Sequence, residues 1–294
     1  MPNLGSDNPF TIGRAVQSID RFWGRSKQAQ FILERVRNNQ CISLVGPQGY
    51  GKTSLLNYVS DPGVRSQHGL HPGAALFVRL EGRELAAYDQ AACLGHFTEC
   101  IIGQTQRVDV ALVGELRSVI EGRSRGHLAL RTLFRVLCDY GRQPVVVLDD
   151  FDDLAHNAQL EDSFFAALRS LATGCQVSYV VASLQPLYEL ETMRPEASTL
   201  CGICTQLTLP PLPDQESRDL LLGLFEQAQV RVPAPIVDLI LGWGRNEPWR
   251  LQVAGYEAFQ VWRENGGGLA DLQEAALVGR FDRAAAHWSS RQGD

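Results

Sequence analysis

Residues 46 to 53 read Gly-Pro-Gln-Gly-Tyr-Gly-Lys-Thr and match the pattern G-x-x-x-x-G-K-[ST] in full. In such a loop, backbone N–H groups surround the nucleotide phosphates, and the dipole of the following helix adds positive potential. The lysine reaches the β- and γ-phosphates, and the Thr53 hydroxyl is a ligand for Mg²⁺. The residues expected to bind the nucleotide here are Gly46, Pro47, Gln48, Gly49, Tyr50, Gly51, Lys52, Thr53 and Ser54.

The sequence around this loop also fits a phosphate-binding site. An apolar segment, 40–45, is typical of a strand, and a helix is predicted from Lys52 to about Val59. Lys27 and Lys52 are the two lysines in a chain whose other basic residues are all arginine. A compact ammonium suits position 52 of such a loop better than a planar guanidinium. The lysine at this position therefore argues against a chance match in an ordinary glycine-rich turn.

A second motif ends in paired acids. The run Val-Val-Val-Leu-Asp-Asp over 145–150 predicts a buried strand with carboxylates at its carboxyl end, beside the phosphate loop. We interpret Asp149 as the Mg²⁺-side acid and Asp150 as the group that orients or deprotonates the attacking water. An acidic loop cap is the simpler interpretation of Asp149 to Asp153. The presence of a phosphate loop in the same chain favours a metal-binding and catalytic role instead.

Strand-like segments alternate with helical ones up to residue 209, which predicts an α/β fold with a parallel sheet flanked by helices. After Pro210-Pro211-Leu212-Pro213 the patterns are helical only. We therefore expect an N-terminal arm over 1–18, a P-loop ATPase core over 19–209 and a helical lid subdomain over 210–294. A winged-helix-like subdomain is the alternative for residues 210–294. The predicted strands are 40–45, 74–80, 144–148, 176–182 and 203–209, and the predicted C-terminal helices are 214–227, 233–241, 248–264 and 269–287.

The spacing of the two motifs resembles a known group. A strand at 74–80 and long helices separate the phosphate-loop strand from the strand that ends at Asp149. This arrangement resembles the additional-strand class that includes AAA+ and STAND ATPases, and the chain is similar to bacterial STAND-like ATPases with an AAA-like domain. The resemblance covers about Asp20 to Trp262. It implies a parallel sheet of order 5-1-4-3-2.

Three shorter motifs carry the same resemblance. Residues 22–25, Phe-Trp-Gly-Arg, resemble the box that packs near adenine, and Ser183 ends a strand where the group places its first sensor residue. Residues 244–252 look like the Gly-x-Pro lid motif of STAND proteins. The resemblance implies a catalytic role for Ser183 and nucleotide-binding roles for Phe22, Trp23, Arg25, Pro248 and Arg250.

The chain departs from the group's pattern at two places. Asp150 stands where many AAA+ proteins carry glutamate, which implies slow hydrolysis or a long-lived ATP state. Leu184-Gln185-Pro186 follows Ser183 where many STAND proteins have an arginine. Arg245 and Arg250 are the candidates to replace that arginine, and a surface helix position is the simpler interpretation of Arg250.

Composition limits the class of protein. Hydrophobic residues make up 45% and charged residues 20%, as in ordinary globular proteins. No apolar run reaches the roughly 20 residues that span a bilayer, and Met1 to Arg14 lacks a signal-peptide core, so we expect a cytoplasmic protein without a membrane partner. The seven cysteines are interpreted as reduced thiols, and Cys201-x-x-Cys204 lacks the second ligand pair of a zinc site.

Charge bears on the partners. The net charge of −6 argues against a large nucleic-acid surface, and the basic segment Arg123 to Arg142 is interpreted as a solvated helix face. The first hypothesis is a Mg²⁺-dependent, slow ATPase that acts as a regulatory switch for a separate protein partner or through self-association. The alternative is an AAA+ ATPase that assists a DNA transaction, as initiators and transposition helpers do, and a third is an ATP-binding scaffold without turnover.

Overall fold

The computed structural model describes residues 7–121, 126–193, 200–266, 268 and 274–290. The chain forms two compact units. The helical unit comprises Met1–Ser26, Gln48–Tyr58 and Pro210–Asp294, and the sheet unit comprises Lys27–Pro47 and Val59–Leu209. Most of the phosphate-loop motif therefore groups with the C-terminal helices, whereas its first two residues stay with the sheet.

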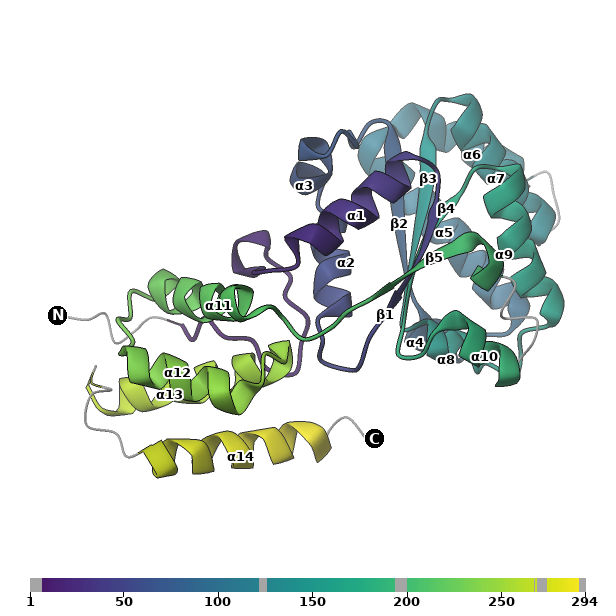
Figure 1. Ribbon diagram of the computed structural model, residues 1–294. Helices are drawn as coiled ribbons and strands as arrows, with labels where there is room; N and C mark the ends of the chain where they lie inside the picture. Colours follow the sequence, from purple (N-terminus) through teal and green to yellow (C-terminus); the bar gives the residue numbers. More distant parts are fainter. Residues whose placement is uncertain (1–6, 122–125, 194–199, 267, 269–273, 291–294) are drawn as a thin grey trace. The chain divides into compact units, whose positions relative to one another are not determined.

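The sheet unit contains five parallel strands in the order β2-β3-β4-β1-β5 (Figure 1). This order confirms the predicted 5-1-4-3-2 arrangement. The central strands carry β-branched residues that are buried on both faces, as parallel sheets require. The strands are β1 (Cys41–Val45), β2 (Ala75–Glu81), β3 (Gln143–Asp149), β4 (Ser178–Ser183) and β5 (Cys204–Thr208).

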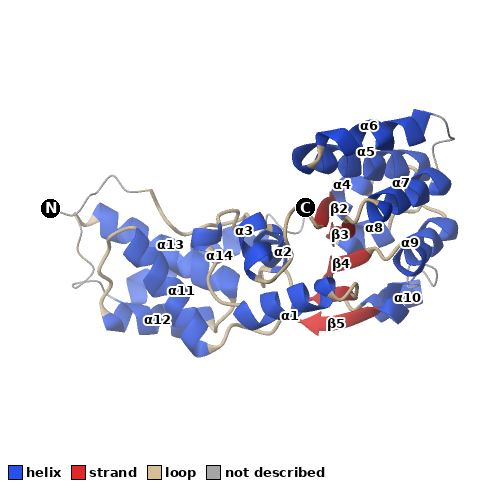
Figure 2. Cartoon of the chain, turned by 90° about the horizontal axis from the view of Figure 1, so that it is seen from above, coloured by secondary structure: helices blue, strands red, loops and turns tan. Residues whose placement is uncertain are grey.

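Helices cover both faces of this sheet (Figures 1 and 2). On one face lie α5 (Gln90–Val108), α6 (Val110–Glu121), α7 (His127–Asp139) and α9 (Asp162–Gly174), and on the other lie α1 (Ser26–Arg37) and α3 (Pro62–Gln67). The longer of these helices turn an apolar stripe to the core.

Helix α7 illustrates that pattern. It buries Leu130, Leu133, Phe134 and Leu137, spaced three and four residues apart, in the core of the sheet unit. Its arginines 131 and 135 are exposed, as predicted for the basic segment. Residues 123 and 125 of that segment lie outside the described residues.

Three short helices follow the carboxyl ends of strands: α4 (Gly82–Leu85) after β2, α8 (Phe151–Ala155) after β3 and α10 (Leu187–Met193) after β4. The sequence analysis did not predict them, because helices this short offer too few positions for a periodic pattern. Gly82 packs against the carbonyl of Asp150 so closely that any side chain at position 82 would collide with it. The ends of β2 and β3 are therefore tightly joined.

The helical unit contains α2 (Lys52–Ser60) for most of its length and the C-terminal helices α11 (Asp214–Gln227), α12 (Ala234–Gly244), α13 (Pro248–Glu264) and α14 (Glu274–Ser290). The predicted limits of α11 and α13 are confirmed. The predicted start of the last helix, residues 269–273, lies outside the described residues. No helix in the described ranges combines the length and the apolar character needed to cross a membrane.

The core of the helical unit joins the C-terminal helices to the N-terminal arm. Phe225, Phe259 and Phe281 are among its fully buried side chains. Phe10 of the arm is also buried, and its ring packs so closely on Gly255 of α13 that only a glycine fits there. A short 3-10 helix, η1 (Ile19–Arg21), then leads toward Phe22.

Candidate functional site

The phosphate-loop motif starts at the carboxyl end of β1. The backbone N–H of Gly46 donates to the Ser183 carbonyl at 3.3 Å, which fixes the start of the loop to β4. Gly49 and Gly51 have φ angles of +79° and +87°, a conformation that glycine adopts at little cost. Helix α2 begins at Lys52, as the motif predicts.

Arg25 is a buried residue that contacts the loop from within the helical unit. It is 3% exposed, and burial lowers its pKa. Its Nη2 donates to the carbonyl of Tyr50 at 3.3 Å and to that of Pro210 at 2.6 Å. Its Nε and Nη1 are also buried, and neither has a hydrogen-bond partner among the described residues. Buried donors without an acceptor are rare in folded proteins, so these two atoms are candidates for contact with a water molecule or a ligand.

The two aromatic residues before Arg25 connect different helices of the same unit. The ring of Phe22 stacks on Tyr58 of α2, with centroids 4.4 Å apart and planes inclined by 19°. The indole of Trp23 packs directly on Gly223 of α11 and leaves no room for a side chain there. The predicted adenine box therefore bridges the helix after the phosphate loop and the first C-terminal helix.

The first turn of α13 lies against the loop. Pro248 is its first residue, where the missing N–H costs nothing. The Trp249 ring packs on Gly49 and donates from Nε1 to Glu247 at 3.0 Å. Arg250 forms an ion pair with Glu247 at 3.0 Å and lies over the Trp249 ring at 5.1 Å. The predicted lid residues thus form one cluster at the phosphate loop.

Ser54 has a partner in the N-terminal arm. Its Oγ accepts from the backbone N–H of Val16 at 3.0 Å, and Asn57 donates to the Val16 carbonyl at 2.8 Å. This pair of bonds holds the arm on α2. The Ser54 hydroxyl therefore has a structural contact beside its predicted nucleotide role.

In the sheet unit, Asp149 ends β3 with a carboxylate that is 1% exposed. Its Oδ2 accepts from Nη2 of Arg79 at 2.6 Å, and its Oδ1 accepts from the Asp150 N–H at 3.1 Å. Nε of the same arginine donates to Glu81 at 2.6 Å. A hard, buried carboxylate of this kind suits Mg²⁺, which is commonly bound by one or two carboxylates together with nucleotide phosphates.

Asp150 adopts the left-handed conformation, with φ of +48°. Aspartate and asparagine enter this region more readily than longer side chains, which gives a physical reason for aspartate instead of glutamate. Its side chain is 35% exposed, and its Oδ2 lies 3.8 Å from Nη2 of Arg83. The pKa of Asp153 is raised, first by burial and then by the negative charge of Asp150.

Ser183 ends β4 and is fully buried. Its hydroxyl donates to the carbonyl of Gln185 at 2.6 Å. The following loop is fixed by Asp152, whose carboxylate accepts from the N–H groups of Leu184 at 2.7 Å and Gln185 at 3.3 Å. The predicted sensor residue thus ends β4, and the loop that follows it is held by hydrogen bonds to Ser183 and Asp152.

A family model described as "Novel STAND NTPase 1" matches residues 15–290. The chain belongs to this family. It is an NTPase of the STAND/AAA+ type, as the resemblance implied. A search of the curated proteins gives no match.

Solved structures similar to this STAND NTPase agree on the fold. The Walker-type ATPase PABY2304 of Pyrococcus abyssi has a TM-score of 0.69 and 15% identity, and the match covers 95% of this chain and 77% of that one. The ORC2 protein of Aeropyrum pernix, in ADPNP-ADP complexes, has a TM-score of 0.63 and 16% identity, with 96% and 71% covered. The ORC1 protein of the same organism, in complex with DNA, has a TM-score of 0.56 and 16% identity, with 92% and 66% covered.

The sequence analysis of this STAND NTPase missed Arg79 and Glu81. Both occur in β2, where a charged residue interrupts the run Ala-Leu-Phe-Val-Arg-Leu-Glu. An arginine in an otherwise buried strand is unusual unless it has a partner, so its presence was a usable signal. The partner itself could not be identified, because it depends on the pairing of β2 with β3.

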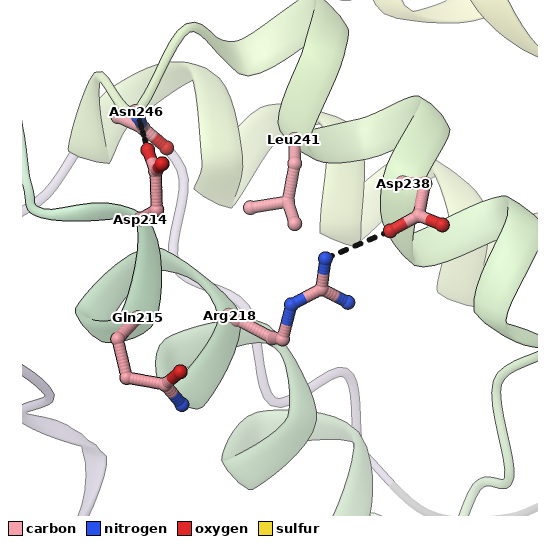
Figure 3. Close-up of a pocket in the computed structure, with 6 residues that line it drawn as sticks. All are labelled: Asp214, Gln215, Arg218, Asp238, Leu241 and Asn246. Atoms are coloured by element: carbon pink, nitrogen blue, oxygen red, sulfur yellow. Dashed lines mark hydrogen bonds and ion pairs between the residues drawn. The ribbon is translucent and has the colours of Figure 1, made fainter.

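A separate pocket of about 320 Å³ lies on the C-terminal helices of this STAND NTPase (Figure 3). It contains none of the predicted nucleotide-site residues. Arg218 pairs with Asp238 at 2.8 Å, and Asn246 donates to Asp214 at 2.6 Å. These bonds tie α11 to α12 and to the turn before α13, so we assign the pocket's polar groups to holding that turn. Its lining residues are Asp214, Gln215, Arg218, Asp238, Leu241 and Asn246.

Proposed function

We propose that this STAND NTPase binds ATP with Mg²⁺, hydrolyses it slowly, and acts as a nucleotide-controlled switch for a separate protein partner or for further copies of itself. The observation that carries the proposal is the contact between the phosphate loop and the first turn of α13, where Trp249 packs on Gly49. A nucleotide in the loop must either keep or change this contact. Helix α13 belongs to the core of the C-terminal helices. A change in the contact between Trp249 and Gly49 would therefore alter the packing of these helices and the surface that they expose.

The buried groups near Arg25 support nucleotide binding. Nε and Nη1 of this arginine lack acceptors among the described residues, while Nη2 is held by the Tyr50 and Pro210 carbonyls. A base or ribose offers oxygen and nitrogen acceptors. The stacked rings of Phe22 and Tyr58 add an apolar surface in the same unit. We infer that this part of the helical unit binds the nucleoside portion of ATP.

The metal and the reaction follow from the two motifs. Thr53 and Asp149 would hold Mg²⁺, which neutralises phosphate charge when it is bound. Lys52 binds the β- and γ-phosphates. Asp150 accepts a hydrogen bond from the attacking water and orients it, and its αL backbone places it at the edge of the sheet with a carboxylate 35% exposed. Ser183 fixes the loop after β4, and its hydroxyl is engaged with Gln185.

Calorimetry and single-turnover hydrolysis test this proposal. We expect Lys52→Ala to lose most ATP affinity, because it removes the cation of the phosphate loop. Lys27→Ala is the matched control, since Lys27 is the other lysine and is exposed on α1. The parent should release phosphate in a single turnover. Equal ATP affinity in both variants, or a parent that never hydrolyses ATP, would contradict the proposed function.

A DNA-directed ATPase is the second candidate, because one similar structure is a protein in complex with DNA. The charges of the C-terminal helices argue against it. Arg218, Arg250 and Arg280 each form an ion pair with an acid of the same unit. Phosphate contacts need available basic side chains. Salt-dependent binding of a labelled DNA duplex by the ATP-loaded protein, measured by anisotropy, would favour this candidate over the protein switch.

A further inference from the structure

Three charged side chains form a chain at the ends of β2 and β3. Glu81 accepts from Nε of Arg79 at 2.6 Å, and Asp149 accepts from Nη2 at 2.6 Å. The strand register sets this arrangement, because Glu81 pairs with Asp149 across the two strands. One guanidinium therefore links an exposed carboxylate to the buried carboxylate predicted to hold Mg²⁺.

The two carboxylates differ in their surroundings. The Asp149 side chain is 1% exposed, whereas that of Glu81 is 44% exposed and that of Arg79 is 26% exposed. An ionised carboxylate buried to this degree is strongly destabilising unless a positive charge compensates it. In the structure Arg79 supplies a positive charge of this kind, 2.6 Å from the carboxylate. The exposed Glu81 carboxylate is in contact with solvent and does not depend on the arginine in this way.

A bound Mg²⁺ supplies the same compensation and repels a guanidinium beside it. Resting on the proposed function, we propose that Arg79 is a counter-charge of Asp149 that would compete with Mg²⁺ for this carboxylate, and that Glu81 would hold the guanidinium when the metal is bound. The ion pair is then a competitor of the metal. Arg79 raises the Mg²⁺ concentration that nucleotide binding requires, and Glu81 lowers it by offering the arginine a second partner.

The proposal predicts opposite effects on the Mg²⁺ requirement for substitutions of Arg79 and of its second partner, Glu81. Arg79→Met removes the competitor, so the Mg²⁺ concentration for half-maximal stabilisation of ATP binding should fall about fivefold or more. Glu81→Gln weakens the second partner, so that concentration should rise about two- to fivefold. Arg79→Lys keeps the charge and should stay closer to the parent than the methionine variant does.

The matched control is Arg142→Met. Arg142 is also 26% exposed, and it forms an ion pair with Asp109 at 2.8 Å in the same unit. It lies just before β3, whereas Asp149 ends that strand. Its removal should leave the Mg²⁺ requirement unchanged. Thermal unfolding without nucleotide provides a second measurement: Arg79→Met should unfold several degrees below the parent, because it removes the positive charge of Arg79 from beside the buried Asp149 carboxylate.

Titration of Mg²⁺ into each protein at saturating ATP, followed by calorimetry, decides the matter. A higher Mg²⁺ requirement in Arg79→Met would overturn the proposal and make Arg79 an orienting residue of the metal ligand. An effect of the same sign in Glu81→Gln and Arg79→Met would also overturn it. ATP binding by the parent at saturating Mg²⁺ is measured first: if the parent does not bind ATP under that condition, the proposed function fails, which is a different result from failure of the counter-charge exchange.

Discussion

The indole of Trp249 lies directly against Gly49 of the phosphate loop: a Cβ on Gly49 would come within 2.7 Å of the indole Cδ1. Trp249 also stacks on Trp288 of α14, with ring centroids 4.3 Å apart and planes inclined by 13°. A single side chain therefore joins the phosphate loop to the last helix. This relationship makes the tryptophan a reporter for nucleotide binding.

We predict that ATP changes tryptophan fluorescence and that most of the change comes from Trp249. In Trp249→Phe the nucleotide-dependent signal should largely disappear, while ATP still binds through the loop. Trp262→Phe is the control, because Trp262 is 3% exposed in the core of the C-terminal helices. A signal that survives in Trp249→Phe but disappears in Trp262→Phe would show that the loop contact is insensitive to the nucleotide.

Arg25 and Arg65 allow a test of the nucleoside site, because both are 3% exposed and burial lowers the pKa of both. Arg65 donates to the Ala75 carbonyl at 3.0 Å and lies over the Phe77 ring. Arg25→Met should weaken ATP binding by about 1.5–3 kcal/mol, the usual value of hydrogen bonds to a charged group. Arg65→Met should lower the unfolding temperature without that loss of affinity. Calorimetry and thermal unfolding of both variants separate the two effects.

Much of the fold was predictable, because its long elements carry strong local signals. The predicted limits of α11 and α13 agree with the structure, since Pro213 and Pro248 mark their starts. The strand order also agrees, although it came from family resemblance and not from hydrophobic patterning. Short helices such as α4 and α8 were not predictable, because their shape depends on the close packing of Gly82 on Asp150.

The residues of the candidate site likewise divide into those that local motifs predict and those that depend on contacts between distant parts of the chain. The phosphate loop and Asp149 follow from local motifs, which need no knowledge of distant residues. The partner of Asp149 does not, because Arg79 lies 70 residues earlier in the chain and contacts it through strand register. The αL backbone of Asp150 was equally hidden, although it explains the choice of aspartate at this position.

The conformation of Asp150 leads to a prediction on catalysis. Asp150→Asn should keep the fold and ATP binding, because asparagine tolerates the left-handed region, and should lower turnover by ~10²–10⁴-fold. Asp150→Glu, which restores the residue common in AAA+ proteins, should not accelerate hydrolysis and should cost about 1 kcal/mol or more in stability. Asp153→Asn is the control, since it changes the neighbouring acid. Single-turnover hydrolysis at the parental rate in Asp150→Asn would rule out a catalytic role for Asp150.

The segment Pro210–Pro213 connects the last strand to α11 and is tied to the turn before α13. The Leu212 N–H donates to the Asn246 carbonyl at 2.8 Å, and Arg25 donates to the Pro210 carbonyl at 2.6 Å. The second bond involves Arg25, a predicted nucleotide contact, and the first involves Asn246, two residues before Pro248. The protease sensitivity of this segment should therefore depend on which nucleotide occupies the loop.

We predict that ATP and ADP give different protease protection around Pro213, and that Arg250→Ala reduces the difference while ATP still binds. Arg250 holds Glu247 at 3.0 Å and covers Trp249, so its loss loosens the turn that transmits the change. A nucleotide shifts this equilibrium only by its differential affinity for the two states, and a tenfold shift needs ~1.4 kcal/mol. Arg218→Ala is the control, because its ion pair with Asp238 lies on the same helices and contains none of the predicted nucleotide contacts. Identical cleavage with ATP, with ADP and without nucleotide would mean that the C-terminal helices are a fixed extension, and the switch would have to be abandoned even if ATP binds.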